Sequence, residues 1–394
     1  MVRQAIILAA GEGQRLRPFT AAKPKVMLRV GGKAIIEHVI EALAGCRICD
    51  IIIVAGYHRE QIYDAVGDGR KFGVSVRYVV QEQQIGTAHA LMQAADLASD
   101  TFLVLPGDQY ITADTVRWLS DTAPWALLST TVADNQTVRY GVVNSENGAL
   151  RSIIEKPRQP CHARVSTGIF ALSRAIFDHI KTDGDMPAVV NRMIGSGIAF
   201  QEVETQAPWL DVIYPWDLIA LNDRILRQQA PLNEGTMEAG VYVQGGVTIG
   251  VGSRLCSGGY LKSPVKIGQG CRIGPNVVIG AGVSIGDNVN IGPFSVIEDS
   301  IIGNDITIGP GSYLYKSVVD SGCQIGSGFK AVAGPAEIHL NGEFLQIDTG
   351  SMVGGNCRIA EGVVASPGSI IGNGCSVAAL KVIKGNIADG SQVV

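Results

Sequence analysis

The chain has 394 residues, of which 46% are hydrophobic and 17% are charged, and its formal net charge is −4. This length and apolar content suit two domains, each with its own core, and exclude a disordered polymer. The small negative charge argues against a protein that coats nucleic acid or anionic lipid, so neither is an expected partner.

The N-terminus and the cysteines favour a cytoplasmic protein. The first apolar run covers only Ala5–Ala10 and leads directly into a glycine-rich loop, which is typical of a buried strand rather than a signal peptide. No uncharged apolar run reaches the roughly 18 residues that a membrane span needs. The eight cysteines lack the spacing of a secreted disulfide framework, and the pair Cys46 and Cys49 has no second pair at zinc-finger spacing.

Residues 1–230 alternate short apolar runs with amphipathic segments. The helix-like segments include Ile35–Ala44, Thr87–Ala95 and Leu218–Gln229. The apolar runs are Ala5–Ala10, Ile51–Ala55, Val74–Val80, Thr101–Leu105 and Trp125–Val132. This alternation predicts an α/β domain over 1–230, with a Rossmann-like, mostly parallel sheet covered by helices on both faces.

Residues 231–394 follow a different pattern, in which an aliphatic residue recurs at every sixth position and is often followed by glycine. The positions are Ile249, Leu255, Leu261, Ile267, Ile273, Ile279, Ile285, Ile291 and Ile297, then Ile302, Ile308 and Leu314, then Val353, Ile359, Ala365, Ile371, Val377 and Ile383. Such a period predicts a parallel β-helix whose short strands each point one side chain inward. The hexapeptide pattern resembles the left-handed β-helix of acyltransferases, which implies association of three chains, as a homotrimer or a dimer of trimers.

The hexapeptide period is lost between Ile325 and Val353, where Ala336–Asp348 is predicted to leave the coil. This excursion is either an ordinary surface loop or a flap over a groove between subunits.

A glycine-rich loop follows the first apolar run. Gly11 and Gly13 permit positive φ and a close approach of the backbone to a ligand, and backbone amides in such a turn bind anions. Arg15 and Lys25 add positive charge. Leu16 stands where a dinucleotide fingerprint needs its third glycine, and the Gly-Lys-Ser/Thr of a P-loop is missing.

The longer string Gly-x-Gly-x-Arg-Leu-x-Pro-x-Thr over residues 11–20, followed by Pro24-Lys25, resembles the signature of sugar-1-phosphate nucleotidylyltransferases. The resemblance implies that Leu8, Ala10, Gly11 and Gly13 hold the nucleotide and its phosphates. It also implies that Arg15 neutralises the leaving pyrophosphate and that Lys25 binds phosphate during transfer.

Gln81-Glu82-Gln83-Gln84-Ile85-Gly86-Thr87-Ala88 resembles the base-reading segment of the same family. By that resemblance Gln81 reads the edge of the base, and Gly86 and Thr87 pack against it or hydrogen-bond to it.

Two aspartates are candidate ligands for Mg²⁺. Asp108 follows a strong apolar strand, and the carboxyl ends of parallel strands are where α/β sheets bind ligands. Asp211 follows Trp209-Leu210. Magnesium prefers a few carboxylates together with phosphate oxygens and water, which these two residues and a triphosphate would supply. Either aspartate by itself is also compatible with a helix cap or a turn.

Two segments resemble the sugar side of the family's site. Gly141 would present backbone groups to the sugar, Glu155 would bind sugar hydroxyls, and Lys156 would bind the sugar phosphate. Ser166 and Thr167 stand where N-acetylglucosamine enzymes often have asparagine in an Asn-x-Gly segment.

The full layout resembles archaeal-type bifunctional enzymes that pair N-acetylglucosamine-1-phosphate uridylyltransferase with an acetyltransferase using acetyl-CoA. Lys316 takes the place of that family's histidine base, and His339 is the one histidine in the second half of the chain. A lysine needs strong desolvation to act as a base, so acetyl transfer stays open here.

The resemblance implies transfer from a nucleoside triphosphate to a sugar 1-phosphate, with UDP-N-acetylglucosamine and pyrophosphate as the expected products. Because Ser166 stands in place of asparagine, glucose 1-phosphate is an alternative sugar substrate. Because uracil and thymine differ by one methyl group, dTTP is an alternative nucleotide. A further alternative is a non-catalytic scaffold that senses nucleotide sugars. Such a scaffold would be expected to lose the phosphate-binding cations or the acids, all of which this chain retains.

Overall fold

The computed structural model describes residues 2–181, 184–340 and 342–394. By their internal contacts the residues group into two compact units. One comprises Met1–Glu12, Lys23–Met27 and Ala34–Asp211, and the other comprises Gly13–Ala22, Leu28–Lys33 and Val212–Val394. The boundary predicted at residue 230 stays a prediction.

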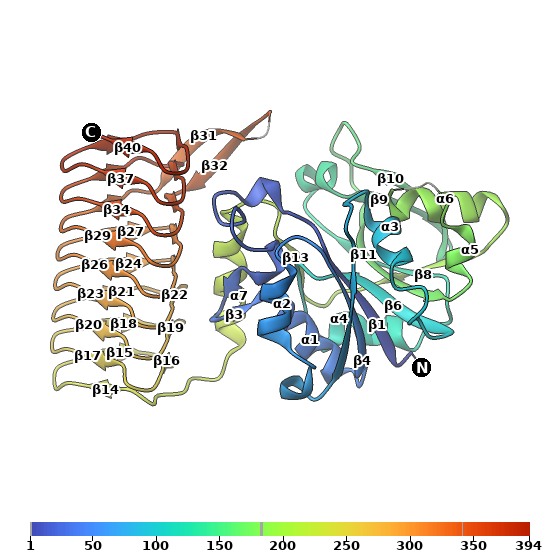
Figure 1. The fold of residues 1–394 in the computed structure, drawn as a ribbon, viewed down its shortest axis with the longest axis horizontal. Coiled ribbons are helices and arrows are strands. Elements are labelled where there is room, and N and C mark those ends of the chain that lie inside the picture. The colour runs from blue at the N-terminus through green and yellow to red at the C-terminus, as the bar shows by residue number, and fades with distance from the viewer. Residues whose placement is uncertain (1, 182–183, 341) are drawn as a thin grey trace. The chain divides into compact units, whose positions relative to one another are not determined.

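The first unit is built on a nine-stranded sheet in the order β5-β4-β1-β6-β11-β8-β12-β10-β9 (Figure 1). Its strands are β1 (Gln4–Ala9), β4 (Asp50–Ala55), β5 (Ser75–Val80), β6 (Thr101–Pro106), β8 (Ala126–Thr131), β9 (Gly141–Glu146), β10 (Ala149–Glu155), β11 (Arg164–Ser173) and β12 (Phe200–Glu204). The first four strands of this order pair in parallel, as does β12 with β8. The alternation of strands and helices thus predicted the α/β class correctly.

The rest of the sheet also contains antiparallel pairs, because β11 runs opposite to β6 and β8, and β10 runs opposite to β12 and β9. Asn147 and Gly148 join β9 to β10 with φ of 49° and 78°. This left-handed Asn-Gly pair is the turn that matches the twist of a two-residue hairpin. The sheet is therefore mixed rather than mostly parallel.

Alternate side chains of the central strands enter two separate cores, one on each face of the sheet. On β1, Ile6 packs in one core, whereas Ala5 and Ile7 pack in the other. The core of Ile7 receives α1 (Ile35–Gly45), α2 (Arg59–Val66) and α4 (Ala113–Ser120). The core of Ile6 receives α3 (Thr87–Met92), α5 (Ile176–His179) and α6 (Met186–Gly195). Both faces are covered, as predicted.

A two-stranded antiparallel pair lies beyond the end of β6. It consists of β7 (Gln109–Ile111) and β13 (Trp209–Asp211), with Gln109 opposite Asp211 and Ile111 opposite Trp209. Trp209 opposes Ile111 and the tip of β6 runs directly into β7, so this pair brings residues far apart in the sequence into one register.

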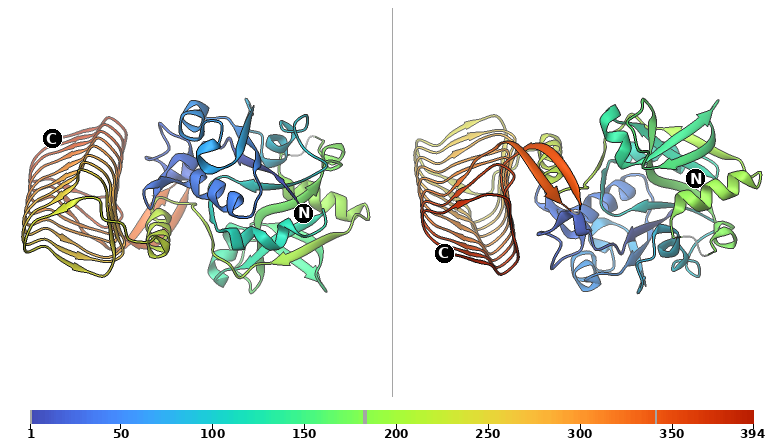
Figure 2. Two further views of the ribbon diagram at one scale, coloured as in Figure 1. Left: turned by 90° about the horizontal axis from the view of Figure 1, so that it is seen from below. Right: turned by 90° about the horizontal axis from the view of Figure 1, so that it is seen from above.

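The second unit contains a left-handed β-helix of short stacked strands (Figures 1 and 2). Its three parallel sheets run from β14 (Thr236–Met237) to β40 (Gln392–Val393), from β15 (Tyr242–Gln244) to β38 (Val382–Ile383), and from β16 (Val247–Ile249) to β39 (Asn386–Ile387). Every aliphatic position of the hexapeptide period lies in one buried core. The prediction of a β-helix is confirmed.

The predicted excursion from the coil is a β-hairpin. β31 (Gly334–Leu340) pairs antiparallel with β32 (Glu343–Thr349), and the hairpin leaves the stack of turns (Figure 2). The coil closes behind it, because β28 (Val318–Val319) pairs in parallel with β33 (Met352–Val353).

Helix α7 (Asp217–Gln228) belongs to the second unit and packs against β22 (Val283–Ile285). Asn222 is fully buried, and its amide accepts from Gly31 N and donates to Gly282 O, both at 2.9 Å. Within the described ranges, none of the helices has the length and apolar character of a membrane span.

Candidate active site

Lys25 and two aspartates meet at the carboxyl end of β6. Lys25 opens a short 3-10 helix, Lys25–Met27, directly after Pro24. Its Nζ lies 2.5 Å from Asp108 Oδ2 and 3.5 Å from Asp211 Oδ1. Asp108 stands between β6 and β7, and Asp211 ends β13, so the β7–β13 pairing brings the two acids to the same amine. Three of the predicted site residues therefore converge.

The three side chains are largely shielded, with 15% of Lys25, 26% of Asp108 and 18% of Asp211 exposed. Burial acts to lower the pKa of Lys25, but the charges and hydrogen bonds of the two carboxylates outweigh it and hold that pKa above 10.5. Lys25 therefore stays positive throughout the neutral range.

The same two carboxylates suit a magnesium ion. They are hard oxygen donors that converge on one positive centre. In the part of the chain that the structure describes, no group of three or more His, Cys, Asp or Glu could hold a metal. Further ligands would come from phosphate and water, which is the arrangement that Mg²⁺ commonly adopts.

The end of β1 fits closely against its neighbours. Leu8 O accepts from Gly107 N at 2.8 Å, and a Cβ added to Gly56 would lie 2.9 Å from both Cβ and O of Ala10. Beyond this, Gly13 has φ of 67°, as predicted. Gly11 does not use positive φ, which corrects that expectation, but a Cβ placed there would meet no atom within 4 Å. Space for a ligand, rather than backbone conformation, distinguishes Gly11.

Arg15 lies in the 3-10 helix Gln14–Leu16, where Leu16 is buried and Arg15 is exposed. Its segment, Gly13–Ala22, groups with the second unit. The role of Arg15 toward pyrophosphate stays a prediction.

The predicted base-reading residues surround the start of α3. Gln81 is 4% exposed, and its Nε2 contacts Gly86 O at 3.2 Å and His89 Nδ1 at 2.9 Å. Gln81 Oε1 accepts no hydrogen bond from the described residues, which suits an acceptor for the N–H of a base. Gly86 has φ of 139°, and a Cβ there would lie 2.2 Å from Gly184 O, so only glycine fits.

The hydroxyl of Thr87 has a structural partner. Its Oγ1 accepts from Met186 N at 3.0 Å and lies 3.5 Å from Asp185 Oδ1, so it joins the start of α3 to the start of α6. The predicted contact of Thr87 with the base stays a prediction.

Three of the predicted sugar-binding residues are neighbours. Gly141 pairs with Glu155 across β9 and β10, and a Cβ on Gly141 would lie 3.0 Å from Glu155 Oε2 and 3.8 Å from Ser166 Cβ. Lys156 follows with φ of 44°, and its Nζ lies 3.7 Å from Glu155 Oε1. Both charged side chains are about half exposed. By contrast, Thr167 is 1% exposed and donates its hydroxyl to Leu128 O at 2.7 Å, so its side chain is not available to a sugar.

One polar residue near this site, Gln109, was missed at the sequence level. Gln109 is 6% exposed and hydrogen-bonds to Thr167 O and to the indole of Trp209. The ring of Trp209 packs edge-on against Tyr140 at 5.2 Å between centroids. A glutamine opening the otherwise apolar segment Gln109–Ile111 was the available signal.

Lys316 and His339, the candidates for acetyl transfer, lie on the coil and its hairpin. Lys316 Nζ is 2.6 Å from Asp348 Oδ1, and this hydrogen bond raises the pKa of Lys316. A general base needs a lowered pKa, so the pairing opposes that role. His339 is exposed and packs its ring against Phe344 at 4.6 Å.

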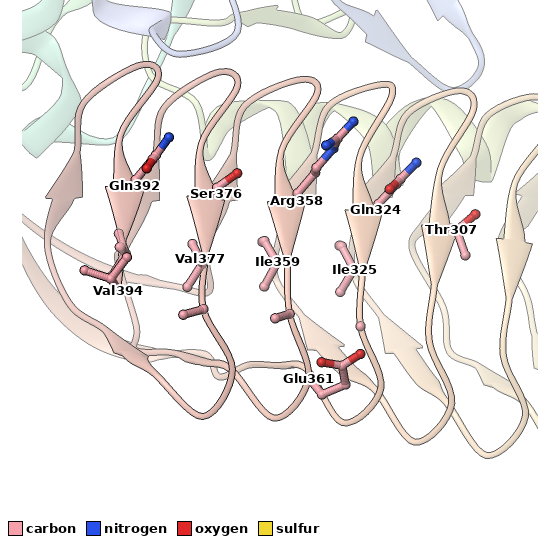
Figure 3. Close-up of a pocket in the computed structure, with 14 residues that line it drawn as sticks. Thr307, Gln324, Ile325, Arg358, Ile359, Glu361, Ser376, Val377, Gln392 and Val394 are labelled. Carbon is pink, nitrogen blue, oxygen red and sulfur yellow. The ribbon is translucent and has the colours of Figure 1, made fainter.

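The depressions along the coil in the described part of the second unit include two of more than 600 Å³. One, of about 620 Å³, lies between α7, the coil and the hairpin and includes Lys316, Asp348, Asp299 and Trp216. The other, of about 660 Å³, follows the last turns of the coil (Figure 3). There Gln324, Arg358, Ser376 and Gln392 form a polar row, and no histidine is among the described residues that line it.

The sequence matches the models of two known protein families. The family model for Nucleotidyl transferase matches residues 4–228, and the model for Bacterial transferase hexapeptide (six repeats) matches residues 264–299. The first match covers more than half of the chain and contains the convergent Lys25, Asp108 and Asp211.

Three relatives have similar sequences. Glucose-1-phosphate thymidylyltransferase of Streptomyces antibioticus is 30% identical over 64% of this chain and 74% of its own length. UTP–glucose-1-phosphate uridylyltransferase AglF of Haloferax volcanii is 32% identical over 59% of this chain and 100% of its own. Bifunctional protein GlmU of Methanococcus maripaludis is 30% identical over 63% of this chain and 61% of its own.

A solved structure described as a glucose-1-phosphate thymidylyltransferase from Bacillus anthracis is also similar. It superposes with a TM-score of 0.53 at 29% identity, covering 58% of this chain and 97% of that chain. The chain therefore belongs to the nucleotidyl transferase family, and its relatives in that family include sugar-1-phosphate nucleotidyltransferases.

Proposed function

We propose that the protein transfers the uridylyl group of UTP to N-acetylglucosamine 1-phosphate, releasing pyrophosphate, with Mg²⁺ as its metal. The observation that carries the reaction type is the shielded cluster in which Lys25 lies between Asp108 and Asp211 at the end of β6. Two phosphorylated substrates can approach one another only where cations offset their charge.

An oxygen of the sugar phosphate attacks the α-phosphorus, and the bond from that phosphorus to the bridging oxygen of pyrophosphate breaks. The ammonium of Lys25 neutralises phosphate charge while the two substrates are held in line. Arg15 and Lys156 are assigned to pyrophosphate and to the sugar phosphate. Bound by Asp108 and Asp211, Mg²⁺ would add positive charge at the triphosphate.

The choice of substrates is supported by the polar groups around the cluster. Gln81 Oε1 suits the N3–H of uracil. Glu155, Gly141 and Ser166 lie together and suit sugar hydroxyls and an acetamido group.

Glucose 1-phosphate, with UTP or dTTP, is the second candidate. Ser166 replaces a longer asparagine of N-acetylglucosamine enzymes, and two of the relatives described above act by name on glucose 1-phosphate. A methyl group on the base changes binding by only about 1–3 kcal/mol.

A matrix of UTP, dTTP, GTP, CTP and ATP against several sugar 1-phosphates tests the proposal through pyrophosphate release. We expect the highest kcat/KM for UTP with N-acetylglucosamine 1-phosphate, and no turnover without added Mg²⁺. A higher kcat/KM with glucose 1-phosphate selects the second candidate. Absence of pyrophosphate from every pair contradicts the proposed function.

We also propose a homotrimer built through the β-helix. On the sheet from β15 to β38, side chains that point outward form a largely apolar row, in which Tyr242 and Tyr260 stack at 5.6 Å. The row continues through Val278, Val296 and Tyr313. Sedimentation equilibrium is expected to give three times the mass of one chain, and a monomer at micromolar concentration contradicts this.

A further inference from the structure

Gln109 occupies the junction between the acidic pair and the sugar side of the site. Its backbone pairs with Asp211, and it directly follows Asp108. Its side-chain Nε2 donates to Thr167 O at 2.7 Å, and its Oε1 accepts from Trp209 Nε1 at 3.0 Å. Both ends of one buried amide are therefore engaged by different segments.

The chemistry of the partners fixes the orientation of this amide. A carbonyl oxygen can only accept, and an indole N–H can only donate. If the amide were flipped, Oε1 would face the Thr167 carbonyl, which also accepts, and Nε2 would face the Trp209 indole N–H, which also donates. Because Gln109 is 6% exposed, water cannot readily compensate for a lost partner.

The first segment that Gln109 holds is the irregular stretch of β11. The register of β11 against β8 shifts between Ser166 and Phe170, and Gly168 within it has φ of 74°. A Cβ on Gly168 would lie 3.1 Å from Pro106 Cγ, so this bulge fits tightly against the end of β6. Ser166, beside Gly141, is the side chain that the bulge presents.

The second segment is the strand that ends at Asp211. Trp209 donates to Gln109 and packs against Tyr140, whose carbonyl accepts from Lys156 N at 3.1 Å. The Trp209 side chain thus links the strand that ends at Asp211 with Tyr140, and through the Tyr140 carbonyl with the backbone of Lys156.

We propose that Gln109 is a positioning residue that holds the sugar-1-phosphate pocket in register with Asp108 and Asp211. The proposal rests on the function proposed above. It assigns to Gln109 no contact with the substrate. Its loss is expected to act on the sugar phosphate more than on the nucleotide.

Gln109→Met tests this, because methionine keeps the length of the side chain and removes both hydrogen bonds. We expect the KM for the sugar 1-phosphate to rise and kcat to fall, with kcat/KM reduced about 10- to 100-fold by misplacement of the pocket. The KM for the nucleotide is expected to stay within about twofold, since among the described residues the side chain of Gln109 hydrogen-bonds to Thr167 and Trp209 and not to Gln81.

Gln4→Met is the matched control. Gln4 is 2% exposed, and its amide bonds to Asp50, Leu97 O and Ser99 N at the opposite end of β1. The Gln4→Met variant should lose about as much thermal stability as Gln109→Met while its kinetic constants stay unchanged. Trp209→Phe, which removes only one of the two bonds, should show a weaker form of the same KM signature and add little to Gln109→Met.

Equal kinetic behaviour of Gln109→Met and Gln4→Met overturns the inference while leaving the proposed function intact. If Gln109→Met does not fold, Trp209→Phe decides in the same way, because a KM for the sugar phosphate equal to that of the wild type overturns the inference. A wild-type chain that releases no pyrophosphate contradicts the proposed function itself.

Discussion

Replacing Lys25 with methionine is expected to lower kcat by about 10³-fold or more, because the loss of one preorganised charge at a transferring group has effects of that order. Lys25 is the cation shared by Asp108 and Asp211, and without it two carboxylates face the incoming phosphates. Pyrophosphate release with saturating UTP and sugar phosphate measures the effect.

Lys71→Met is the control for this change. Lys71 is 52% exposed and pairs with Glu37 at 3.1 Å on the surface, so its replacement should leave kcat within about twofold, as the small energies of surface pairs imply. The circular dichroism spectrum of Lys25→Met should match that of the wild type. Near-normal turnover of folded Lys25→Met would contradict the role of Lys25.

Asp108→Asn is expected to have the second large effect, lowering turnover by about 10²-fold or more, since it removes a proposed metal ligand and a charge partner of Lys25 together. Asparagine preserves the shape, so the loss reports charge. The Mg²⁺ concentration for half-maximal activity should rise. Asp114→Asn, on an exposed residue paired with Arg117 at 3.3 Å, is the control and should change neither value.

The pH dependence of Asp108→Asn provides a separate readout. Burial acts to lower the pKa of Lys25, and Asp108 makes the first contribution against it, so removing Asp108 should lower that pKa. The residual activity of Asp108→Asn should therefore fall at a lower alkaline pH than wild-type activity does. An identical alkaline limit in both proteins would argue that Lys25 does not titrate with activity.

The raised pKa of Lys25 also makes the free energy of unfolding depend on pH. The folded-state pKa of Lys25 is raised above 10.5, so the pair stabilises the fold fully below pH 10.5. That contribution is lost only as the pH rises through the higher folded-state value.

The β-helix could be predicted from residue spacing because its physics is local. Each turn repeats one environment, so an inward position such as Ile267 or Ile359 must be aliphatic wherever it falls. The excursion at Ala336–Asp348 was visible for the same reason, as a loss of period, although nothing in it specified a hairpin with Glu337 opposite Gln346.

The candidate site was only partly predictable. Lys25 stands in a string that resembles a family signature, and Asp108 follows a strong apolar strand. The position of Asp211, however, depends on the pairing of β13 with β7, which local sequence does not encode. Gln109 was missed because burial turns a glutamine from a surface residue into a link between segments, and burial is a tertiary property. Thr87 is the reverse case: the sequence predicted a contact with the base, whereas in the structure its hydroxyl contacts Met186 and Asp185.

The pairing of β7 with β13 also has a consequence for synthesis of the protein. The ribosome adds Asp108 well before Asp211, and at 5–20 residues per second the intervening stretch takes roughly 5–20 s. Until then a nascent chain carries Lys25 and one acid but lacks the second. Completion of the proposed metal-binding pair thus waits until the last residue of the first unit, Asp211, has emerged.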